Sequence, residues 1–543
     1  MIEISIRKWY NPTASIAVIG LFVTLTCVIA YHLGADVNWD LQNYHFYNGY
    51  LYTHGRLITG SLATVQSYLD PMLNSFYYLL ISTLTPLQVN LAIAALQSLS
   101  LASAFFLSML VFEGNSYQNK FTLSAIISIS ALFGPIFWSE IGGTMGDSLL
   151  ALPVIVSAIF SVKSVAMADA IKQRSIYVAI SGVMIGFASG LKFTNMTYAV
   201  AMLVALAIVF FLSNLRYKEQ LLLLTIFGSA ALISFLTTYG PVGWLLWRDF
   251  QNPIFPYFND IFRSPYLEAH VIHDTRWFPR NLIGYLKLPF EFCVRRHQNA
   301  NSSHLVGMEI PFRTYLYAAI FIFLPFYIIS RYEFGASQGR KGYGGLFLVL
   351  FFVASFIVWE VMFSYYRYIA ALEIIAPLTL VVMLSSFFKD GFDKGGIPVA
   401  AAMLVLALSL HSLPDSNWGR EPFAASYFGV NKNMLKNYRD SLIVVGYAPM
   451  GFVLPYFPSS NGVIGLPERI IGLTQRFQKS YLRKLRNFKG DIYYLSEYNK
   501  SLSIVKKHAE YLRRTYNLNI VYDSCKEIKT SIYPVAVCAV TKS

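Results

Sequence analysis

Two aspartates, Asp36 and Asp40, open the segment of this sequence whose residue types are best suited to chemistry, Asp36-Val37-Asn38-Trp39-Asp40-Leu41-Gln42-Asn43-Tyr44-His45. Their four-residue spacing would place both carboxylates on one face of a helix or at its start. A carboxylate beside a low-dielectric surface is well placed to act as a general base, and Asp40 has the more apolar and aromatic surroundings. Asp36 could instead be a helix N-cap, and His45 either orients a reacting group or packs at an interface.

A third acid, Asp147, follows Gly142-Gly143-Thr144-Met145-Gly146 and stands at the start of a long apolar stretch. If that stretch crosses a membrane, an acid at its mouth costs free energy unless it meets water or a partner. Such an acid is therefore a candidate functional residue. The alternative is structural, because the helix dipole favours acids at helix N-termini.

Four cations accompany these acids near the ends of apolar stretches: Arg56, Lys192, Arg248 and Arg367. Lys192 lies in Gly190-Leu191-Lys192-Phe193-Thr194, and Arg367 follows Tyr366 in Tyr365-Tyr366-Arg367-Tyr368. Phosphate groups are bound well by such cations, and best by a bidentate arginine. The alternative for each is a long side chain that extends from a helix end into the headgroup region.

Several familiar motifs are absent from the sequence. It contains no phosphate-cradling glycine loop, no dinucleotide fingerprint and no paired cysteine–histidine metal motif. Nucleotide-driven chemistry therefore has no support. Whether a metal takes part is left open, with a divalent cation as the candidate.

The elements that must position these residues are long apolar segments. The chain has 543 residues, of which 55% are hydrophobic and 13% charged, about half the usual charged share of soluble proteins. The apolar residues fall in blocks about 20 long, enough to cross a hydrocarbon core of about 30 Å. We therefore expect a polytopic α-helical membrane protein with about eleven transmembrane helices, at 13–33, 88–111, 121–138, 147–162, 176–191, 196–213, 221–240, 312–330, 344–362, 368–388 and 397–412.

The basic residues between these blocks indicate the orientation. If the helices alternate, one side of the membrane carries Arg7, Lys8, Lys120, Lys163, Lys172, Arg174, Arg216, Lys218, Arg331, Arg340, Lys341, Lys389 and Lys394. The opposite short loops carry only Lys192 and Arg367. Because positive loops stay in the cytoplasm, the N-terminus is expected there, in a multi-pass protein of the cytoplasmic (inner) membrane. An odd number of spans then places the tail on the periplasmic or extracellular face.

This topology predicts a transmembrane domain at 1–412 with two long outer loops, 34–87 and 241–311, and a soluble α/β domain at 413–543. Aromatic residues spaced three and four apart predict interfacial helices in the first loop. In the tail, we expect strands at 441–447, 491–496, 518–523 and 535–541, with helices at 467–488 and 502–516. Cys525 and Cys538 share this tail, where a disulfide and two free thiols are both open.

The net charge of +14 does not indicate nucleic-acid binding. Nineteen Lys and Arg against nine Asp and Glu lie in 413–543, contributing +10, and most of the remainder punctuates loops. The tail is therefore expected to meet an anionic acceptor or anionic membrane lipids, or simply to present a solvated basic surface.

The pattern resembles the integral-membrane glycosyltransferases of the GT-C type, in topology over 1–412 and in short motifs. The motifs are Asp40–His45 followed by Gly55-Arg56-Leu57, Leu69-Asp70-Pro71-Met72 with Phe76-Tyr77-Tyr78-Leu79, Asp147-Ser148-Leu149-Leu150, Asn252-Pro253-Ile254-Phe255-Pro256 and Arg367-Tyr368. Many members of this type have adjacent acids in the first outer loop, whereas Asp36 and Asp40 are separated by three residues. Asp40 fits the distance to Gly55-Arg56 better. The tail resembles no family.

The resemblance implies transfer of a sugar from a polyprenyl-phosphate donor to a glycan or lipid acceptor on the outer face, by an inverting single displacement. Asp40, with Asp36 as its rival, and Asp147 are then the catalytic candidates. The resemblance implies that Asp147 binds the acceptor, a sugar hydroxyl or a divalent ion. The substrate-binding candidates are Asn43, His45, Arg56, Lys192, Arg248, Tyr366 and Arg367. The acids are expected to gather at the outer lip of the membrane.

The main alternative is a multi-span lipid or solute transporter, or a flippase. Such proteins have broken helices and buried ionisable residues in mid-span. Apart from Glu360 and Glu373, the span interiors carry few acids, which favours the enzyme. A membrane scaffold that docks a partner through the aromatic loop is a second alternative.

Overall fold

The computed structural model describes residues 12–57, 65–112, 117–167, 170–269, 274–296, 306–334, 342–387, 397–414, 417–446, 449–466 and 474–542. The expected cytoplasmic basic residues Arg7, Lys8, Arg340, Lys341, Lys389 and Lys394 lie outside these ranges. The chain divides into two compact units. Unit 1 comprises Met1–His32, Leu91–Thr238 and Asp274–Trp418; unit 2 comprises Leu33–Asn90, Tyr239–His273 and Gly419–Ser543.

Long apolar helices make up most of unit 1. Eight helical segments are long and apolar enough to cross a membrane: Thr13–Leu33, Pro86–Val111, Asp147–Ala166, Ile171–Leu191, Phe193–Leu212, Tyr217–Phe250, Gly342–Met362 and Tyr366–Ser385. They correspond to the helices α2 (Pro12–Leu33), α5 (Pro86–Val111), α8 (Asp147–Val162), α9 (Ile171–Leu191), α10 (Met196–Leu212), α11 (Tyr217–Phe250), α15 (Gly342–Met362) and α16 (Ala370–Ser385). The protein is thus a multi-pass α-helical membrane protein, as expected.

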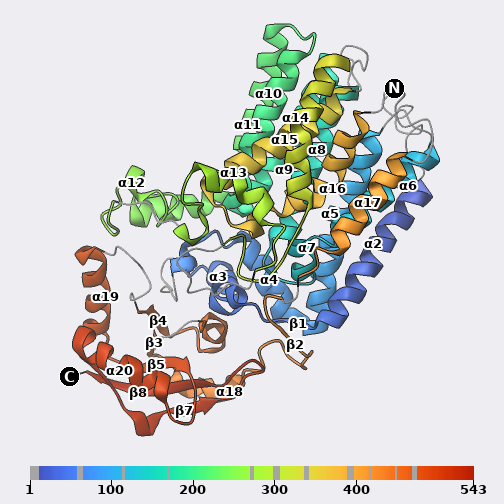
Figure 1. Cartoon of the computed structure of the whole chain (residues 1–543). Helices are drawn as coiled ribbons and strands as arrows, with labels where there is room; N and C mark the ends of the chain where they lie inside the picture. The colour runs from blue at the N-terminus through green and yellow to red at the C-terminus, as the bar shows by residue number, and fades with distance from the viewer. Residues whose placement is uncertain are drawn as a thin grey trace. The chain divides into compact units, whose positions relative to one another are not determined.

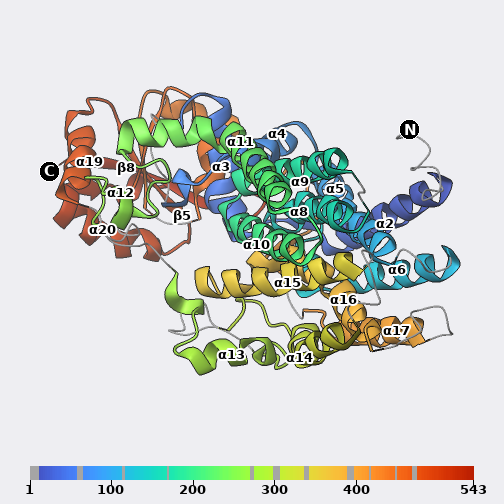
Figure 2. The same cartoon turned by 90° about the horizontal axis from the view of Figure 1, so that it is seen from above.

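Three of the expected spans correspond to helices that are not among these eight. They are α6 (Tyr117–Leu132), α14 (Leu316–Phe334) and α17 (Ile397–Leu410), and a short helix α7 (Pro135–Glu140) follows α6. The count of about eleven spans therefore stays a prediction. Figure 2 shows α8, α9, α10, α11 and α15 lying beside one another as a bundle.

A row of glycines joins α9 to α11. At Gly182, Gly186 and Gly190, four residues apart, an added Cβ would collide with Phe227, Ala231 and Thr238 of α11. Small residues at this spacing let two membrane helices approach closely, because no side chain separates the backbones. The seam fixes the position of the end of α9, which carries Lys192.

Unit 2 contains residues 34–87, the predicted first outer loop. Its elements are β1 (Ala35–Asp36), the π-helical turn η1 (Leu41–His45), α3 (Phe46–Thr53), η2 (Val65–Tyr68) and α4 (Met72–Thr83). Gly49 of α3 packs directly on the backbone of Asn74 in α4. The prediction of short helices in this loop is confirmed. The second outer loop contributes α12 (Asn259–Phe262) to unit 2, and η5 (Thr275–Trp277) and α13 (Leu282–Glu291) to unit 1.

The tail forms a six-stranded sheet with helices (Figure 1). Its strands are β3 (Leu442–Val445), β4 (Gly462–Gly465), β5 (Ile492–Glu497), β6 (Leu518–Ile520), β7 (Lys526–Ile528) and β8 (Val535–Lys542). The order is β4-β3-β5-β8-β6, with β7 also pairing β8; β3 is parallel to β4 and β5, and β8 is antiparallel to its partners. The other tail elements are β2 (Arg420–Glu421), α18 (Lys432–Leu435), η11 (Gly451–Tyr456), α19 (Gln475–Asn487) and α20 (Ser503–Tyr516).

The α/β nature of the tail and four of its strands are confirmed. The sequence pattern missed the short strands β4 and β7. Residues 467–473 of the first expected helix lie outside the described ranges. Cys525 and Cys538 form a disulfide, which decides between the two alternatives left open for them. Cys27 and Cys293 are free thiols.

Candidate functional site

A cluster of charges in unit 1 joins three helix ends. The Asp147 carboxylate lies 2.6 Å from the Lys192 ammonium and 3.3 Å from Nε of Arg367. The Asp147 side chain is only 4% exposed, and that of Arg367 10%. The structure therefore brings together three residues that the sequence singled out separately, at the start of α8, the end of α9 and just before α16.

Local backbone features hold these three side chains in place. Gly146, which precedes α8, has a φ of +88°, a conformation that glycine adopts at low cost, so Asp147 becomes the first residue of the helix. Lys192 follows α9, and its ammonium also donates to the Met145 carbonyl at 3.1 Å. Arg367 lies in the short 3-10 turn η8 (Tyr366–Ile369), which leads into α16.

Glu140 is a fourth member of this cluster that the sequence did not assign to the site. It is fully buried, and its carboxylate accepts a hydrogen bond from the Ser148 backbone N–H at 2.9 Å. Burial, and then the nearby charge of Asp147, raise the pKa of Glu140 well above its ordinary value. Its position seven residues before Asp147, across a glycine-rich turn, is the sequence signal that could have revealed it.

The carboxylate of Glu373 in α16 fixes the short helix that carries Glu140. Its two oxygens accept hydrogen bonds from the backbone N–H groups of Ile136 (3.1 Å) and Phe137 (2.9 Å), the first donors of α7. A buried acid at a helix N-terminus satisfies orphan donors and interacts favourably with the helix dipole. Glu373 therefore has a structural role, which is to cap the N-terminus of α7.

The charged cluster carries an excess of positive charge. With Glu140 protonated, one carboxylate faces two cations. The guanidinium of Arg367 lies over the rings of Tyr365, Tyr368 and Trp418, with distances of 5.3, 5.7 and 5.5 Å to their centroids. Cations held in aromatic, poorly solvated surroundings attract anions strongly, because water screens the charges less. This arrangement suits the binding of a phosphate.

A buried hydroxyl points to the same conclusion. Ser148 Oγ is fully buried and has no hydrogen-bond partner among the described residues. Buried polar atoms are nearly always paired in native proteins, so an unpaired one beside a charged cluster indicates water or a ligand.

The second outer loop adjoins this cluster through Tyr365. The Tyr365 ring packs on Trp277 with centroids 4.4 Å apart, and its hydroxyl donates to Glu309 at 2.6 Å. Asp274 accepts the indole N–H of Trp277 at 2.9 Å and pairs with Arg276 at 2.6 Å. Partial burial raises the pKa of Asp274, but the hydrogen bonds and charge of Arg276, with the Trp277 hydrogen bond, together outweigh it and hold that pKa below its ordinary value.

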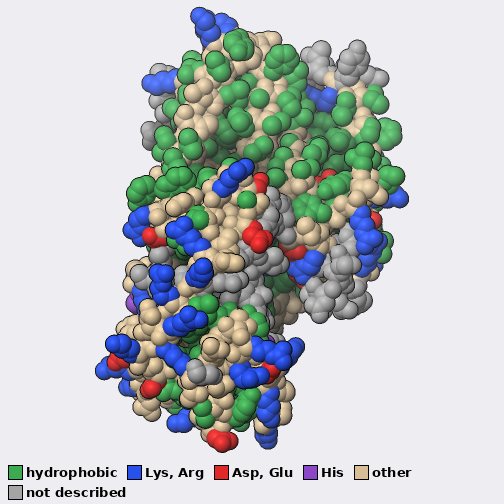
Figure 3. All heavy atoms as spheres, turned by 90° about the vertical axis from the view of Figure 1, so that its left-hand side faces the viewer, with side chains coloured by type: hydrophobic (Ala, Val, Ile, Leu, Met, Phe, Trp, Pro, Cys, Tyr) green, Lys and Arg blue, Asp and Glu red, His purple; other side chains and the backbone are tan. Residues whose placement is uncertain are grey.

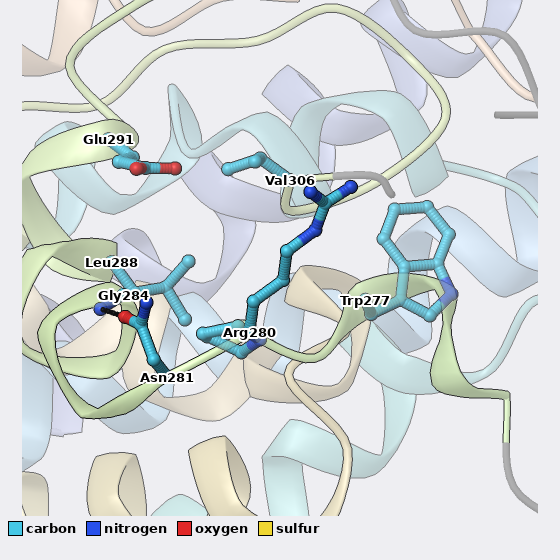
Figure 4. A pocket seen from close by; sticks show the side chains of 8 residues that line it. Trp277, Arg280, Asn281, Gly284, Leu288, Glu291 and Val306 are labelled. Atoms are coloured by element: carbon cyan, nitrogen blue, oxygen red, sulfur yellow. Dashed lines mark hydrogen bonds between the residues drawn. The ribbon is translucent and has the colours of Figure 1, made fainter. Parts of the chain in front are cut away.

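A pocket of about 140 Å³ lies in this loop, bounded by η5, α13 and Val306. Figure 4 shows the Arg280 side chain extended into it. Its lining is Trp277, Pro279, Arg280, Asn281, Gly284, Leu288, Glu291 and Val306, so that apolar walls carry one cation and one acid. Trp277, which lines the pocket, packs on Tyr365, and the guanidinium of Arg367 lies over the Tyr365 ring.

Asp36, in unit 2, is part of the fold of the first loop. It lies in β1, opposite Arg420 of β2, and is 1% exposed. The side-chain amide of Asn38 donates to both of its carboxylate oxygens, at 3.0 and 2.7 Å, and the Tyr427 hydroxyl donates to its backbone carbonyl at 2.8 Å. The carboxylate therefore links the loop internally, and the two first-loop acids do not share a helix face.

Asp40 has a different environment, at the start of the helical segment that continues into η1. Its side chain is half-buried and does not cap that turn. Asn43 is fully buried, and neither polar atom of its side chain has a partner among the described residues. His45 is buried and packs edge-on against Tyr44, with centroids 4.4 Å apart, and against Tyr77 at 6.2 Å.

The remaining candidates lie in varied places. Arg56 donates to the Asn461 carbonyl of the tail at 2.8 Å. Arg248, near the end of α11, is 55% exposed and pairs with its neighbour Asp249 at 2.9 Å. Tyr366 is fully buried in an aromatic group that includes Phe312, at 4.3 Å between centroids. Their roles in binding a substrate stay predictions.

No group of three or more His, Cys, Asp or Glu that could hold a metal ion is found in the described part of the chain. Asp147, the candidate ligand of a divalent cation, is engaged by two cationic side chains. These partners fit a phosphate-binding cluster better than a metal site, because a cation would be repelled by both.

The fold and these sites define a multi-pass membrane protein with an α/β tail. Two structures of ArnT from Cupriavidus metallidurans are similar to it, one bound to undecaprenyl phosphate (TM-score 0.45, 10% identity) and one in the apo state (TM-score 0.47, 12% identity). Each similarity covers 97% of this chain and 98% of that chain.

An archaeal oligosaccharyltransferase is also similar. The structure of AglB from Archaeoglobus fulgidus in complex with an inhibitory peptide and a dolichol-phosphate has a TM-score of 0.41 and 12% identity, over 90% of this chain and 70% of that chain. No family model matches this chain, and neither does any curated protein.

Proposed function

We propose that this protein is an integral-membrane glycosyltransferase of the GT-C type, which moves a sugar from a polyprenyl-phosphate donor to a glycan or lipid acceptor. The observation that carries the proposal is the cluster of Lys192 and Arg367 around Asp147, with its excess positive charge. A lipid phosphate is the kind of ligand that two partly buried cations at the end of a membrane helix would bind.

In the proposed reaction, Asp40 accepts the proton of an acceptor hydroxyl. The hydroxyl oxygen forms a bond to the anomeric carbon, and the bond from that carbon to the phosphate oxygen breaks with inversion. The polyprenyl phosphate leaves with the electron pair, and Lys192 and Arg367 neutralise the charge that develops on it. Asp147 is proposed as a positioning residue, which holds the two cations side by side.

The proposed orientation has the N-terminus in the cytoplasm and the tail on the outer face of the cytoplasmic membrane. The disulfide between Cys525 and Cys538 supports it, because disulfides persist in oxidising compartments and are rare in the cytosol. The positive-inside pattern of the connectors supports it independently.

The transporter alternative has less support. Of the two acids inside spans, Glu373 caps α7 and is thereby used in the fold. A flippase would move a labelled polyprenyl-phosphate sugar between the leaflets of a vesicle without releasing its sugar. A glycosyltransferase would release free polyprenyl phosphate.

The experiment is to incubate the purified full-length protein in lipid nanodiscs with a panel of polyprenyl-phosphate sugars and to measure the polyprenyl phosphate released. We expect release with at least one donor, and at least a hundredfold loss in Asp40→Asn, since general-base catalysis contributes about 10²–10⁴-fold. Asp260→Asn, at an exposed acid of α12 in the second outer loop, is the matched control and should keep full activity. Folded wild-type protein that turns over no donor, or a folded Asp40→Asn variant with full activity, would contradict the proposal.

A further inference from the structure

Residues of the tail contact the chain on both sides of the turn η1, in the predicted first outer loop. Before the turn, β1 pairs with β2 of the tail, so that Ala35 lies opposite Glu421. After the turn, the ring of Phe46 packs on Phe428 of the tail, with centroids 4.8 Å apart, and on Tyr456 of η11 at 6.1 Å. All of these residues belong to unit 2. The tail therefore holds the chain at both ends of η1.

The 3-10 helix η11 also contacts the turn itself, through Gly451. An added Cβ at Gly451 would overlap the carbonyl group of Asn43 and would lie 3.1 Å from the carbonyl oxygen of Gln42. The φ of Gly451 is not in the left-handed region, so its backbone conformation is open to other residues. Glycine is required here because the two backbones meet without space for a side chain.

The turn depends on such support because its own hydrogen bonding is incomplete. It is a π-helical turn, a rare backbone conformation that is frequently found at functional sites. Asn43 is fully buried, and neither polar atom of its side chain has a partner among the described residues; the same holds for Oε1 of Gln42. Unpaired buried polar groups cost free energy, so a turn that contains them persists only where the surrounding structure holds it.

The core of the tail fixes η11. Phe452 and Val453 of this helix are fully buried. The ring of Phe452 packs on those of Phe428 and Tyr533, with centroids 5.2 and 5.6 Å apart. The Tyr533 hydroxyl also donates a hydrogen bond to the carbonyl of Pro449, just before η11. The helix that meets the turn is therefore part of the packed interior of the tail.

The segment that contains η11 follows the strand β3, at a switch point of the tail sheet. From β3 the chain passes to β4 on one side and then to β5 on the other, and both strands are parallel to β3. Open α/β sheets generally bind their ligands beyond the carboxyl ends of the strands at such a point. Here the segment beyond β3 meets η1, and η1 begins directly after Asp40.

The tail residues named in this contact, Phe428, Gly451 and Tyr456, are uncharged. The Lys and Arg side chains of the tail are instead spread over its surface (Figure 3). A substitution at Gly451 therefore alters the contact and leaves the basic surface of the tail unchanged.

We propose that the tail positions the first-loop segment that carries Asp40, and that Gly451 is a positioning residue for this acid. The inference rests on the proposed function for the role of Asp40, and it gives the tail a part in the reaction. The close approach of Gly451 fixes η1, and η1 fixes the direction in which the Asp40 carboxylate leaves the backbone. An added methyl group would displace both, and a displacement of about 1 Å can cost about a hundredfold in rate.

The kinetic test compares Gly451→Ala with the wild type, as full-length proteins in lipid nanodiscs. The substrate is the donor of the polyprenyl-phosphate sugar panel that the wild type turns over fastest. We expect the kcat for release of polyprenyl phosphate to fall about a hundredfold. The KM for the donor should stay within about threefold, because the proposed phosphate ligands Lys192 and Arg367 belong to unit 1.

Gly490→Ala is the matched control. An added Cβ at Gly490 would lie 2.8 Å from the carbonyl oxygen of Asp440, so this variant also crowds a backbone carbonyl of the tail. Both residues precede the amino ends of the parallel strands β3 and β5, whereas η11 follows the carboxyl end of β3. The control should keep the kcat of the wild type.

Hydrogen exchange, measured by mass spectrometry, reports on the turn directly. In Gly451→Ala, the backbone amides of Leu41–Phe46 should exchange at least about tenfold faster, with no comparable change in β5 and β8. A general loss of tail stability would instead raise exchange throughout the tail. If Gly451→Ala does not fold, the wild type supplies the test: reduction of Cys525–Cys538 destabilises the tail and should raise exchange in Leu41–Phe46 together with η11.

Four results would overturn the proposal. They are a folded Gly451→Ala variant with the kcat of the wild type, the same variant with unchanged exchange at Leu41–Phe46, an equal loss of kcat in Gly490→Ala, and a reduced wild type in which η11 exchanges while Leu41–Phe46 stays protected.

The exchange test and the turnover test can fail separately. Faster exchange of the turn in Gly451→Ala, with a wild type that turns over no donor, would remove the proposed function and leave the tail as the support of η1. Donor turnover that Gly451→Ala leaves unchanged would remove the positioning role and leave the proposed function.

Discussion

Asp147→Asn tests the proposal that the charged cluster is built for a phosphate. In the unliganded protein, the Asp147 carboxylate balances Lys192 at 2.6 Å and Arg367 at 3.3 Å, and it is almost entirely buried. Removing one partner from a buried ion pair costs about 3–5 kcal/mol, because the remaining charge stays buried without compensation. We therefore expect the variant to unfold at a clearly lower temperature than the wild type.

Polyprenyl phosphate should reverse much of this loss. The substitution removes a negative charge from between the two cations, so an added phosphate meets cations that are less compensated than in the wild type. We expect the apparent Kd for polyprenyl phosphate to fall about tenfold in the variant, which corresponds to about 1.4 kcal/mol. The ligand should raise the unfolding temperature of the variant by more than that of the wild type.

The assay is thermal unfolding in nanodiscs, with a titration of polyprenyl phosphate. Glu219→Gln is the matched control, since Glu219 forms an ion pair with the exposed Arg216 at 2.6 Å and should contribute within about 1 kcal/mol. The reasoning would be refuted by a variant as stable as the wild type, or by a lipid phosphate that stabilises the variant less than the wild type.

Three further predictions concern pH and redox state. Because its pKa is raised, Glu140 ionises only at alkaline pH, where its negative charge lowers the net charge of the cluster. The Kd for polyprenyl phosphate should therefore rise at alkaline pH. Glu140→Gln should flatten this dependence of the Kd on pH. Burial raises the pKa of Asp70 to about 7 in the folded state, whereas the ordinary value of 3.8 applies in the unfolded state. As the pH rises above 3.8, the unfolded state ionises first and is favoured. The free energy of unfolding is therefore lowered by about 4 kcal/mol at pH 8. Asp70→Asn should therefore unfold at a higher temperature than the wild type at pH 8 and at a similar one near pH 4; equal unfolding temperatures at pH 8 would show that the acid is not destabilising. Reduction of Cys525–Cys538, which are 13 residues apart, should cost the tail about 3 kcal/mol, measured by denaturant unfolding with thiol labelling.

The membrane helices could be predicted from the sequence because the bilayer imposes a simple rule on length and polarity. The same rule explains why Asp147, Lys192 and Arg367 could be chosen as candidates, since charged residues at the ends of apolar blocks stand out. The alternation of the helices placed all three on one face of the membrane. Their meeting within 3.3 Å depends on helix packing, which the hydropathy pattern does not contain.

Other features depend on contacts between distant residues. The spacing of Glu140 from Asp147 is visible in the sequence, but its contact with the Ser148 backbone and its burial are known only from the structure. The strand β4 is short and contains two glycines, so its sequence gives little strand signal. For Asp36, the bonds to Asn38 could not be read from spacing, because they require a strand where a helix start was expected.

The place of β8 in the tail sheet affects how the tail is assembled. This strand follows the other five strands of that sheet along the chain, yet it pairs with three of them, β5, β6 and β7. During synthesis, β5, β6 and β7 emerge from the ribosome before β8, the strand with which all three pair. The sheet can therefore close only after β8 (Val535–Lys542) has been synthesised, and loss of β8 should leave an open, aggregation-prone half-sheet.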